Sequence, residues 1–126
     1  MEIPVKIESH IVFLDGIING HKLSFCRDTG AESNVLSIHQ PNRVLNTVSI
    51  LGKTNLRSAG AQQVEVLYGI MDDFSIDRQN FEDMNTIVTN LNAMNHAYGA
   101  NIDGMLGRDF LERGILYINL IKEKRK

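Results

Sequence analysis

The chain has 126 residues, the length of a single domain, and 43% of them are hydrophobic, enough for one ordinary core. Thirteen basic residues nearly balance fifteen acidic ones, so neither nucleic-acid binding nor attraction to an anionic membrane is expected. One cysteine excludes an internal disulfide, no apolar run reaches the ~18 residues of a membrane span, and no signal peptide is visible, which fits a cytoplasmic protein or an exported one whose signal was removed.

Short strands are expected along most of the chain. They are predicted from β-branched, aromatic or alternating apolar residues at 3–8, 11–14, 23–26, 35–38, 46–51, 64–68, 81–88 and 115–121. Asn19-Gly20 stands between two of them and predicts a tight hairpin, because both turn positions need positive φ. The polar stretches 40–45 and 91–100 are predicted as loops, and 107–112 as one short helix. The pattern indicates a single all-β domain over residues 1–126.

The stretch Asp28-Thr29-Gly30-Ala31 directly follows the apolar strand 23–26. An Asp-Thr-Gly turn at the end of an apolar strand has one dominant chemical use, which is to hold a carboxylate against a second carboxylate so that the pair activates water. Like charges a few ångströms apart do not both ionise easily, so the pair shares a proton and supplies both a base and an acid. Cys26, on the same strand, is expected to be a small buried residue.

A second segment lies about eighty residues further on. It reads Ile102-Asp103-Gly104-Met105-Leu106-Gly107-Arg108-Asp109-Phe110-Leu111. Together with the Asp-Thr-Gly-Ala turn, this apolar pair and glycine before a short helix resembles the retropepsin-like, single-lobe aspartic proteases of retroviral type. The resemblance covers most of the chain. It implies an all-β, closed-barrel acid protease fold with one short C-terminal helix, and an aspartic endopeptidase that acts on an extended peptide or protein substrate.

The chain contains one Asp-Thr-Gly, so each copy supplies one carboxylate, and the second must come from a symmetric homodimer with Asp28 of each chain at the two-fold axis. The resemblance implies that Thr29 bonds across the dimer and that Gly30 contacts the substrate main chain. Ala31 keeps the wall of the site small. Glu32 is expected to bind substrate backbone and to receive a forked ion pair from Arg108, which would brace the turn.

The family resembled also closes its cleft with a glycine-bearing hairpin. The best candidate is the segment around Ser58, Ala59 and Gly60, between the strands near Ile50 and Val66. Neither a cofactor nor a metal ion is expected, because the four histidines are scattered without ligand spacing. The expected partners are a second copy of the chain and a peptide, with no nucleic acid and no membrane.

Arg27 departs from the family pattern, which has an apolar residue before the aspartate. Its guanidinium must reach solvent or pair with a carboxylate, because a buried unpaired charge is very costly. This residue and the glycine-poor flap leave a second hypothesis open, in which the protein is a catalytically silent peptide-binding or dimerisation module that kept the fold.

Other carboxylates are given structural roles. Asp72, Asp73 and Asp77 lack the pattern of a calcium loop and are predicted to lie in a solvated turn. Asp103 belongs to the second segment as a structural residue. Asp109 is expected at the start of the short helix, where a carboxylate is favourable beside exposed N–H groups.

Overall fold

The computed structural model describes residues 2–4, 6–8, 11–28, 30–57, 63–113 and 117–119. Its strands are β1 (Glu2–Pro4), β2 (Lys6–Glu8), β3 (Ile11–Ile18), β4 (His21–Arg27), β5 (Asn34–Ser37), β6 (Val48–Arg57), β7 (Gln63–Met71), β8 (Phe74–Ile76), β9 (Gln79–Phe81), β10 (Met84–Thr89), β11 (Gly104–Leu106) and β12 (Tyr117–Asn119). Its helices are α1 (Asn42–Leu45), α2 (Asn92–Tyr98) and α3 (Arg108–Leu111).

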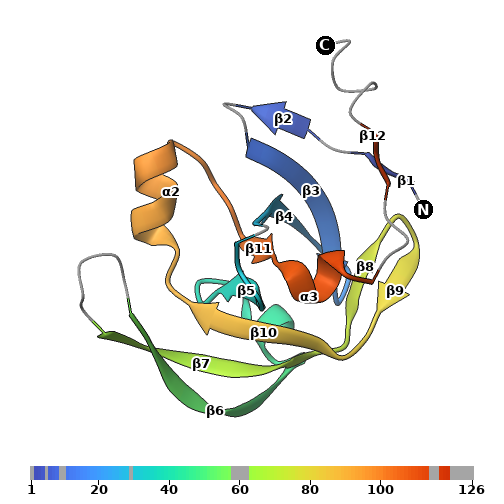
Figure 1. Ribbon diagram of the computed structural model, residues 1–126. Helices are drawn as coiled ribbons and strands as arrows, with labels where there is room; N and C mark the ends of the chain where they lie inside the picture. Colours follow the sequence, from blue (N-terminus) through green and yellow to red (C-terminus); the bar gives the residue numbers. More distant parts are fainter. Residues whose placement is uncertain are drawn as a thin grey trace.

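Ten strands form one sheet in the order β6-β7-β10-β5-β11-β4-β3-β8-β9, with β2 paired to β3, and β1 pairs separately with β12. The large sheet curls around α3 and does not lie flat (Figure 1). A curled sheet of this kind places its concave side around a single core, so residues distant in sequence meet inside it.

β11 is the strand on which the site depends, because it lies between β4 and β5. It runs parallel to β4, with Met105 opposite Cys26, and antiparallel to β5, with Gly104 opposite Leu36. The chain immediately after β4 and the chain immediately after β11 therefore leave the sheet side by side.

The predicted hairpin at Asn19-Gly20 is confirmed. Both residues have positive φ, 49° and 75°, and β3 pairs with β4 through to Ile18 opposite His21. Leu23 and Phe25 point into the core with no more than 2% of their surface exposed. The tight turn thus sets the register that aims these side chains inward.

An aromatic cluster packs the core beneath the site. Phe25 of β4 meets Phe74 of β8 edge to face with ring centroids 5.1 Å apart, and Phe110 of α3 meets Phe81 of β9 at 4.9 Å. All four rings are buried. Such edge-to-face pairs contribute about 0.5–1.5 kcal/mol each beyond the area they bury. Through Phe74, these ring contacts connect α3 to β4 on the core side of the site.

The sequence prediction of a single short helix was incomplete. Residues 42–45 form α1, where buried Val44 anchors a turn after Pro41. Residues 92–98 form α2, although 91–100 was predicted as a loop. Asn95 explains the difference, because its side-chain amide donates to the carbonyl of Ile102 at 3.0 Å and accepts from the N–H of Ile102 at 2.9 Å. Gly99 then ends the helix in a left-handed conformation with φ 61°.

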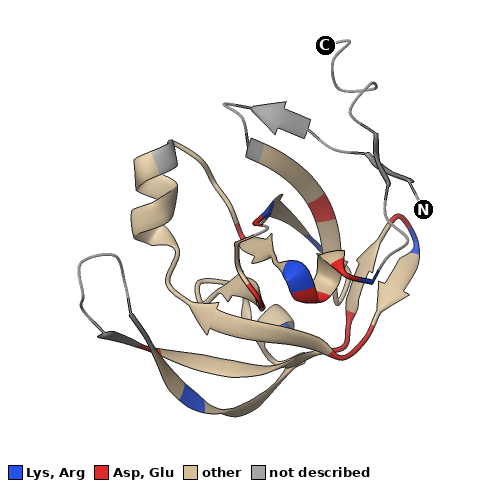
Figure 2. Ribbon diagram, in the orientation of Figure 1, with Lys and Arg blue, Asp and Glu red and all other residues tan. Residues whose placement is uncertain are grey.

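The hairpin β8–β9 was also missed. Its turn uses Asp77 and Arg78, both with positive φ (49° and 70°), where the sequence offers no glycine. Asp72, Asp73 and Asp77 are nevertheless exposed, as expected of a solvated turn. Figure 2 shows acidic residues gathered around the turns that flank β8 and β9.

β10 confirms the predicted face of its strand, since Met84, Thr86 and Val88 are all buried. β6 and β7 are longer than the predicted strands 46–51 and 64–68. Part of the predicted C-terminal strand 115–121 lies outside the described residues. Among those described, no helix is long and apolar enough to span a bilayer.

Candidate active site

Asp28 lies just past the end of β4, half-buried, where the chain leaves the sheet. Its amide N–H donates to the carbonyl oxygen of Leu106 at 2.9 Å, so the β4–β11 pairing continues into the turn. The N–H of Gly30 donates to Asp28 Oδ1 at 3.1 Å. The carboxylate is therefore oriented by the main chain of its own turn. Thr29 lies outside the described residues.

The segment that follows β11 holds the rest of the turn through main-chain bonds. The N–H of Arg108 donates to the carbonyl of Ala31 at 2.8 Å, and the N–H of Asp109 donates to that of Glu32 at 3.0 Å. Gly107 fits between them so closely that a Cβ atom there would lie 2.7 Å from the Ala31 carbonyl oxygen and 2.4 Å from that of Ser33. The residue between β11 and α3 must therefore be glycine.

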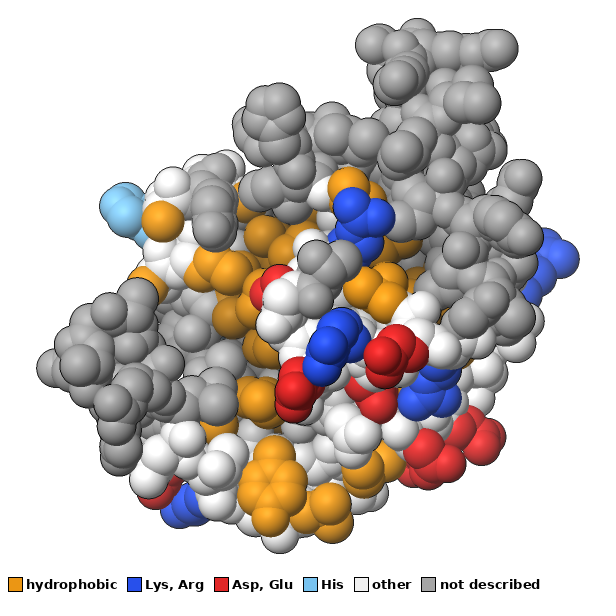
Figure 3. Space-filling model, in the orientation of Figure 1, with side chains coloured by type: hydrophobic (Ala, Val, Ile, Leu, Met, Phe, Trp, Pro, Cys, Tyr) orange, Lys and Arg blue, Asp and Glu red, His pale blue; other side chains and the backbone are white. Residues whose placement is uncertain are grey.

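The predicted contact between Arg108 and Glu32 is present. Nη2 of Arg108 lies 3.2 Å from Oε1 of Glu32, as a single contact and not the expected fork. The two side chains are 53% and 84% exposed. Figure 3 shows charged side chains of both signs next to one another over the region of α3. In one copy of the chain this exposed pair is worth at most about 1 kcal/mol, and its role in bracing the turn stays a prediction.

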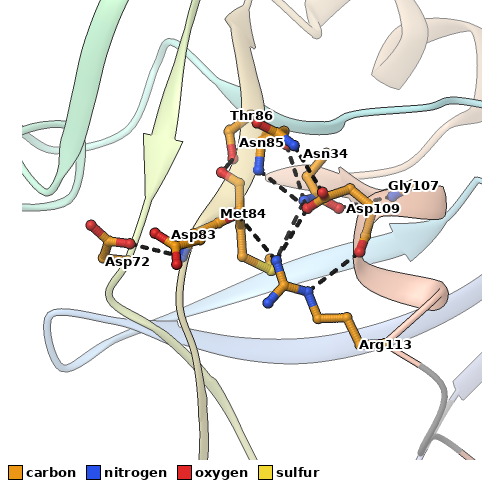
Figure 4. Close-up of polar contacts among 9 residues, drawn as sticks. All are labelled: Asn34, Asp72, Asp83, Met84, Asn85, Thr86, Gly107, Asp109 and Arg113. Atoms are coloured by element: carbon orange, nitrogen blue, oxygen red, sulfur yellow. Dashed lines mark hydrogen bonds and ion pairs between the residues drawn. The ribbon is translucent and has the colours of Figure 1, made fainter.

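Two residues on the core side of the site, Asn34 and Asp109, also connect the Asp28 turn to the segment after β11. The sequence did not indicate either of them as a site residue. Asn34, the first residue of β5, is fully buried, and its side chain bonds both Gly107 and Asp109. Asp109 does lie in the first turn of α3, as predicted, but its carboxylate turns toward Asn34 and Asn85 (Figure 4). The expectation that it serves exposed helix N–H groups was wrong, because its described hydrogen bonds come from the side-chain amide of buried Asn34, from the backbone N–H and side-chain amide of exposed Asn85, and from Arg113, just after α3.

Asp103 has the structural place that was expected. Its Oδ2 accepts from the N–H of Ser24 at 2.8 Å, and its Oδ1 accepts from Nε2 of Gln40 at 3.1 Å. The carboxylate thus joins the chain before β11 to β4 and to the loop that precedes α1. It does not face Asp28.

Arg27 and Cys26 flank the approach to Asp28 along β4. Arg27 is exposed, so its charge reaches solvent, the first of the two outcomes that its position allowed. Cys26 is buried, as expected, and burial raises the pKa of its thiol to about 11, with a further contribution from the charge of Asp28. A thiol with so high a pKa is uncharged at neutral pH and is a poor nucleophile.

The candidate flap residues Ser58, Ala59 and Gly60 lie outside the described residues. The strands that lead to them are described, and β6 and β7 pair as far as Arg57 opposite Gln63. No group of three or more His, Cys, Asp or Glu side chains that could hold a metal ion occurs in the described part of the chain.

Comparison with known protein families matches residues 14–110 to the family described as aspartyl protease. This stretch contains the Asp28 turn and the Gly107-Arg108-Asp109 segment. The chain therefore belongs to the aspartyl protease family. No functionally curated protein matches it.

Solved structures confirm the fold. A retropepsin-like aspartic protease from Rickettsia conorii is similar with a TM-score of 0.58 and 18% sequence identity, over 86% of this chain and 76% of that one. EIAV protease in complex with the inhibitor HBY-793 is similar with a TM-score of 0.59 and 21% identity, over 80% of this chain and 85% of that one. The predicted all-β, retropepsin-like fold is confirmed, with one copy of the chain forming a curled half-barrel.

Proposed function

We propose that this protein is an aspartic endopeptidase whose active centre is made by two copies of the chain, each contributing Asp28. The observation that carries the proposal is the half-buried Asp28 carboxylate at the end of β4, oriented by the N–H of Gly30 and fixed through the carbonyl of Leu106. Membership of the aspartyl protease family supports it. No other carboxylate of the described residues has this setting.

The chemistry follows from two carboxylates sharing one proton. The ionised group takes a proton from water as the water attacks the peptide carbonyl carbon, and the protonated group hydrogen-bonds the carbonyl oxygen. The amine leaves with a proton from the pair, so the pair ends as it began. One chain supplies half of this pair, which is why a two-fold dimer is required.

The substrate would be an extended peptide, bound partly through its main chain as an added strand. Thr29, Gly30 and Ala31 shape the turn, Glu32 and Arg108 brace it, and the hairpin of β6 and β7 would bring Ser58, Ala59 and Gly60 over the peptide. The paired arms of that hairpin support this placement.

The decisive experiment compares peptide cleavage between about pH 3 and 7 by the wild type, Asp28→Asn and Asp15→Asn. Asp15 is a matched control because its carboxylate is 63% exposed and, among the described residues, pairs with Lys22 alone, at 3.5 Å. We expect Asp28→Asn to lose on the order of a thousandfold or more in kcat, and Asp15→Asn to keep full activity. A dimeric wild type that cleaves nothing at any of these pH values would favour the silent binding module.

Mixing tests the shared active centre. After subunit exchange with a ninefold excess of Asp28→Asn, the activity of a fixed amount of wild type should fall about tenfold, because only wild-type pairs then carry both carboxylates. An undiminished activity after complete exchange would show that a single chain is sufficient and would overturn the proposal.

A further inference from the structure

The described part of the Asp28 turn makes few hydrogen bonds within itself. Within the described part of the turn, the N–H of Gly30 bonds Asp28 Oδ1 and the N–H of Ala31 bonds the Asp28 carbonyl at a long 3.3 Å. Three shorter bonds, between 2.8 and 3.0 Å, come from the segment Leu106–Asp109. The position of the Asp28 turn therefore depends on where that segment lies.

Asn34 fixes the segment from the strand side. Its Oδ1 accepts from the N–H of Gly107 at 3.0 Å, and its Nδ2 donates to Asp109 Oδ2 at 3.0 Å and to the carbonyl of Asn85 at 3.1 Å. The residue is fully buried. Water cannot replace these bonds, because the side chain has no exposed surface, and the loss of a buried partner costs more than the mean value of a hydrogen bond.

Asp109 fixes the segment from the helix side. Asn85 of β10 donates to its carboxylate twice, from the backbone N–H to Oδ2 at 3.1 Å and from Nδ2 to Oδ1 at 3.0 Å. Arg113 approaches Oδ2 at 3.5 Å and also donates from Nη2 to the Asp83 carbonyl at 3.1 Å. Figure 4 shows these groups converging on one carboxylate from β5, from β10 and from Arg113 just after α3. The carboxylate is 17% exposed, so its charge is balanced mainly by these donors.

We propose that Asn34 and Asp109 are positioning residues for Asp28, which act by fixing the Leu106–Asp109 segment whose main chain holds the Asp28 turn. The inference rests on the proposed function of Asp28. Neither side chain touches Asp28, so neither is a catalytic residue. They join the turn to β10, a strand on the far side of β5, and a carboxylate pair that must share a proton is sensitive to small shifts of either member.

The test compares Asn34→Ala and Asp109→Asn with Ile76→Val, all assayed as folded dimers well below their unfolding temperatures. Ile76 is a buried core residue of β8 with no bond to the turn, so its variant is a matched control for lost stability. Asp109→Asn keeps the shape of the side chain and removes its charge, which keeps the test open if Asn34→Ala does not fold.

We expect Asn34→Ala to lower kcat on the order of ten- to a hundredfold with less than about a threefold change in KM, and Asp109→Asn to lower it less. The pH profile of kcat/KM should shift in both, because the geometry of the carboxylate pair sets how it titrates. Ile76→Val should keep both kcat and profile. Unchanged kcat and pH profile in both variants would overturn the proposal.

Hydrogen exchange gives a readout that needs no activity. The amides of Asp28, Arg108 and Asp109 should lose protection selectively in Asn34→Ala, while those of the β3–β4 hairpin keep theirs. An equal loss over the whole sheet would show general destabilisation and would contradict a positioning role. A wild type without activity, or an active Asp28→Asn, would instead refute the proposed function and leave the exchange result standing.

Discussion

Two links join the segment that follows Asp28 to α3, and they differ in charge, in exposure and in the number of hydrogen bonds. Glu32 and Arg108 carry opposite full charges, but they meet through one exposed contact. Asn34 and Asp109 meet below them, where Asn34 is fully buried and the donors to Asp109 come from β5, from β10 and from Arg113 just after α3. Solvent screens the first link and reaches the second much less, because the Asp109 carboxylate is only 17% exposed. The pair that is more conspicuous in the sequence is therefore the weaker one.

Removing the partly buried carboxylate of Asp109 should have the largest effect on this comparison. Asp109→Ala should lower the free energy of unfolding by about 2–4 kcal/mol, because it removes the acceptor shared by the Asn34 and Asn85 amides and the one carboxylate that pairs with Arg113 among the described residues. Urea unfolding measures the change. Asp15→Ala, at an exposed carboxylate, should stay within about 0.5 kcal/mol of the wild type. Equal losses in the two variants would mean that burial does not distinguish these carboxylates.

The close fit of Gly107 sharpens the comparison at the backbone. Gly107→Ala should cost roughly 1–3 kcal/mol, because the added carbon meets two main-chain oxygens that cannot move aside. Gly99→Ala is the informative partner, since its site is open but its φ is 61°, and backbone strain alone should cost about 1 kcal/mol. If Gly107→Ala proves the milder of the two in urea unfolding, the packing around Gly107 is looser than the contacts indicate.

The buried thiol of Cys26 should make the stability of the fold depend on pH. Its pKa is raised from 9.0 to about 11 in the folded chain, so the unfolded chain loses the thiol proton first as pH rises. The unfolded state then binds fewer protons, and stability due to the neutral thiol is present below pH 9 and falls between about pH 9 and 11. Cys26→Ala should remove this part of the decline when unfolding free energies are compared across that range. Parallel curves for the two proteins would contradict the assignment.

The exposed pair should give the smallest effect. Glu32→Gln and Arg108→Gln should each change stability by less than about 1 kcal/mol, with a double-mutant coupling that disappears at 1 M salt. The measurement is urea unfolding of both single variants and the double variant. A salt-resistant coupling above about 2 kcal/mol would show that the pair is buried in the assembled protein, and would reverse the order of the two links.

Local signals in the sequence predicted the parts of the fold that local physics decides. Asn19-Gly20 marked a hairpin because its positive φ values follow from residue type, and the alternation of Met84, Thr86 and Val88 marked a buried strand face. The turn at Asp77 and Arg78 escaped notice because its positive φ values are imposed by the strands it joins and not by glycine. Helix α2 escaped because the Asn95 bonds that stabilise it reach beyond the helix to Ile102.

The site, too, was predictable only where short motifs in the sequence indicate it. The Asp28 turn and the contact of Arg108 with Glu32 followed from a resemblance carried by short motifs. Asn34 could not be found in that way, since an asparagine after a turn is ordinarily exposed and its burial follows only from the order of strands around β11. The one indication in the sequence that Asn34 is buried is that it directly precedes the apolar residues Val35 and Leu36.

The central place of β11 also governs when the turn at Asp28 can form during synthesis. A ribosome that has released only the first hundred residues has made β4 and β5, yet the strand that belongs between them has not emerged. Until β11 is made, β4 and β5 lack the strand that pairs with both of them. The turn that bears Asp28 then also lacks its bond to the carbonyl of Leu106. The main-chain support of the Asp28 turn is thus completed only after most of the chain has been translated.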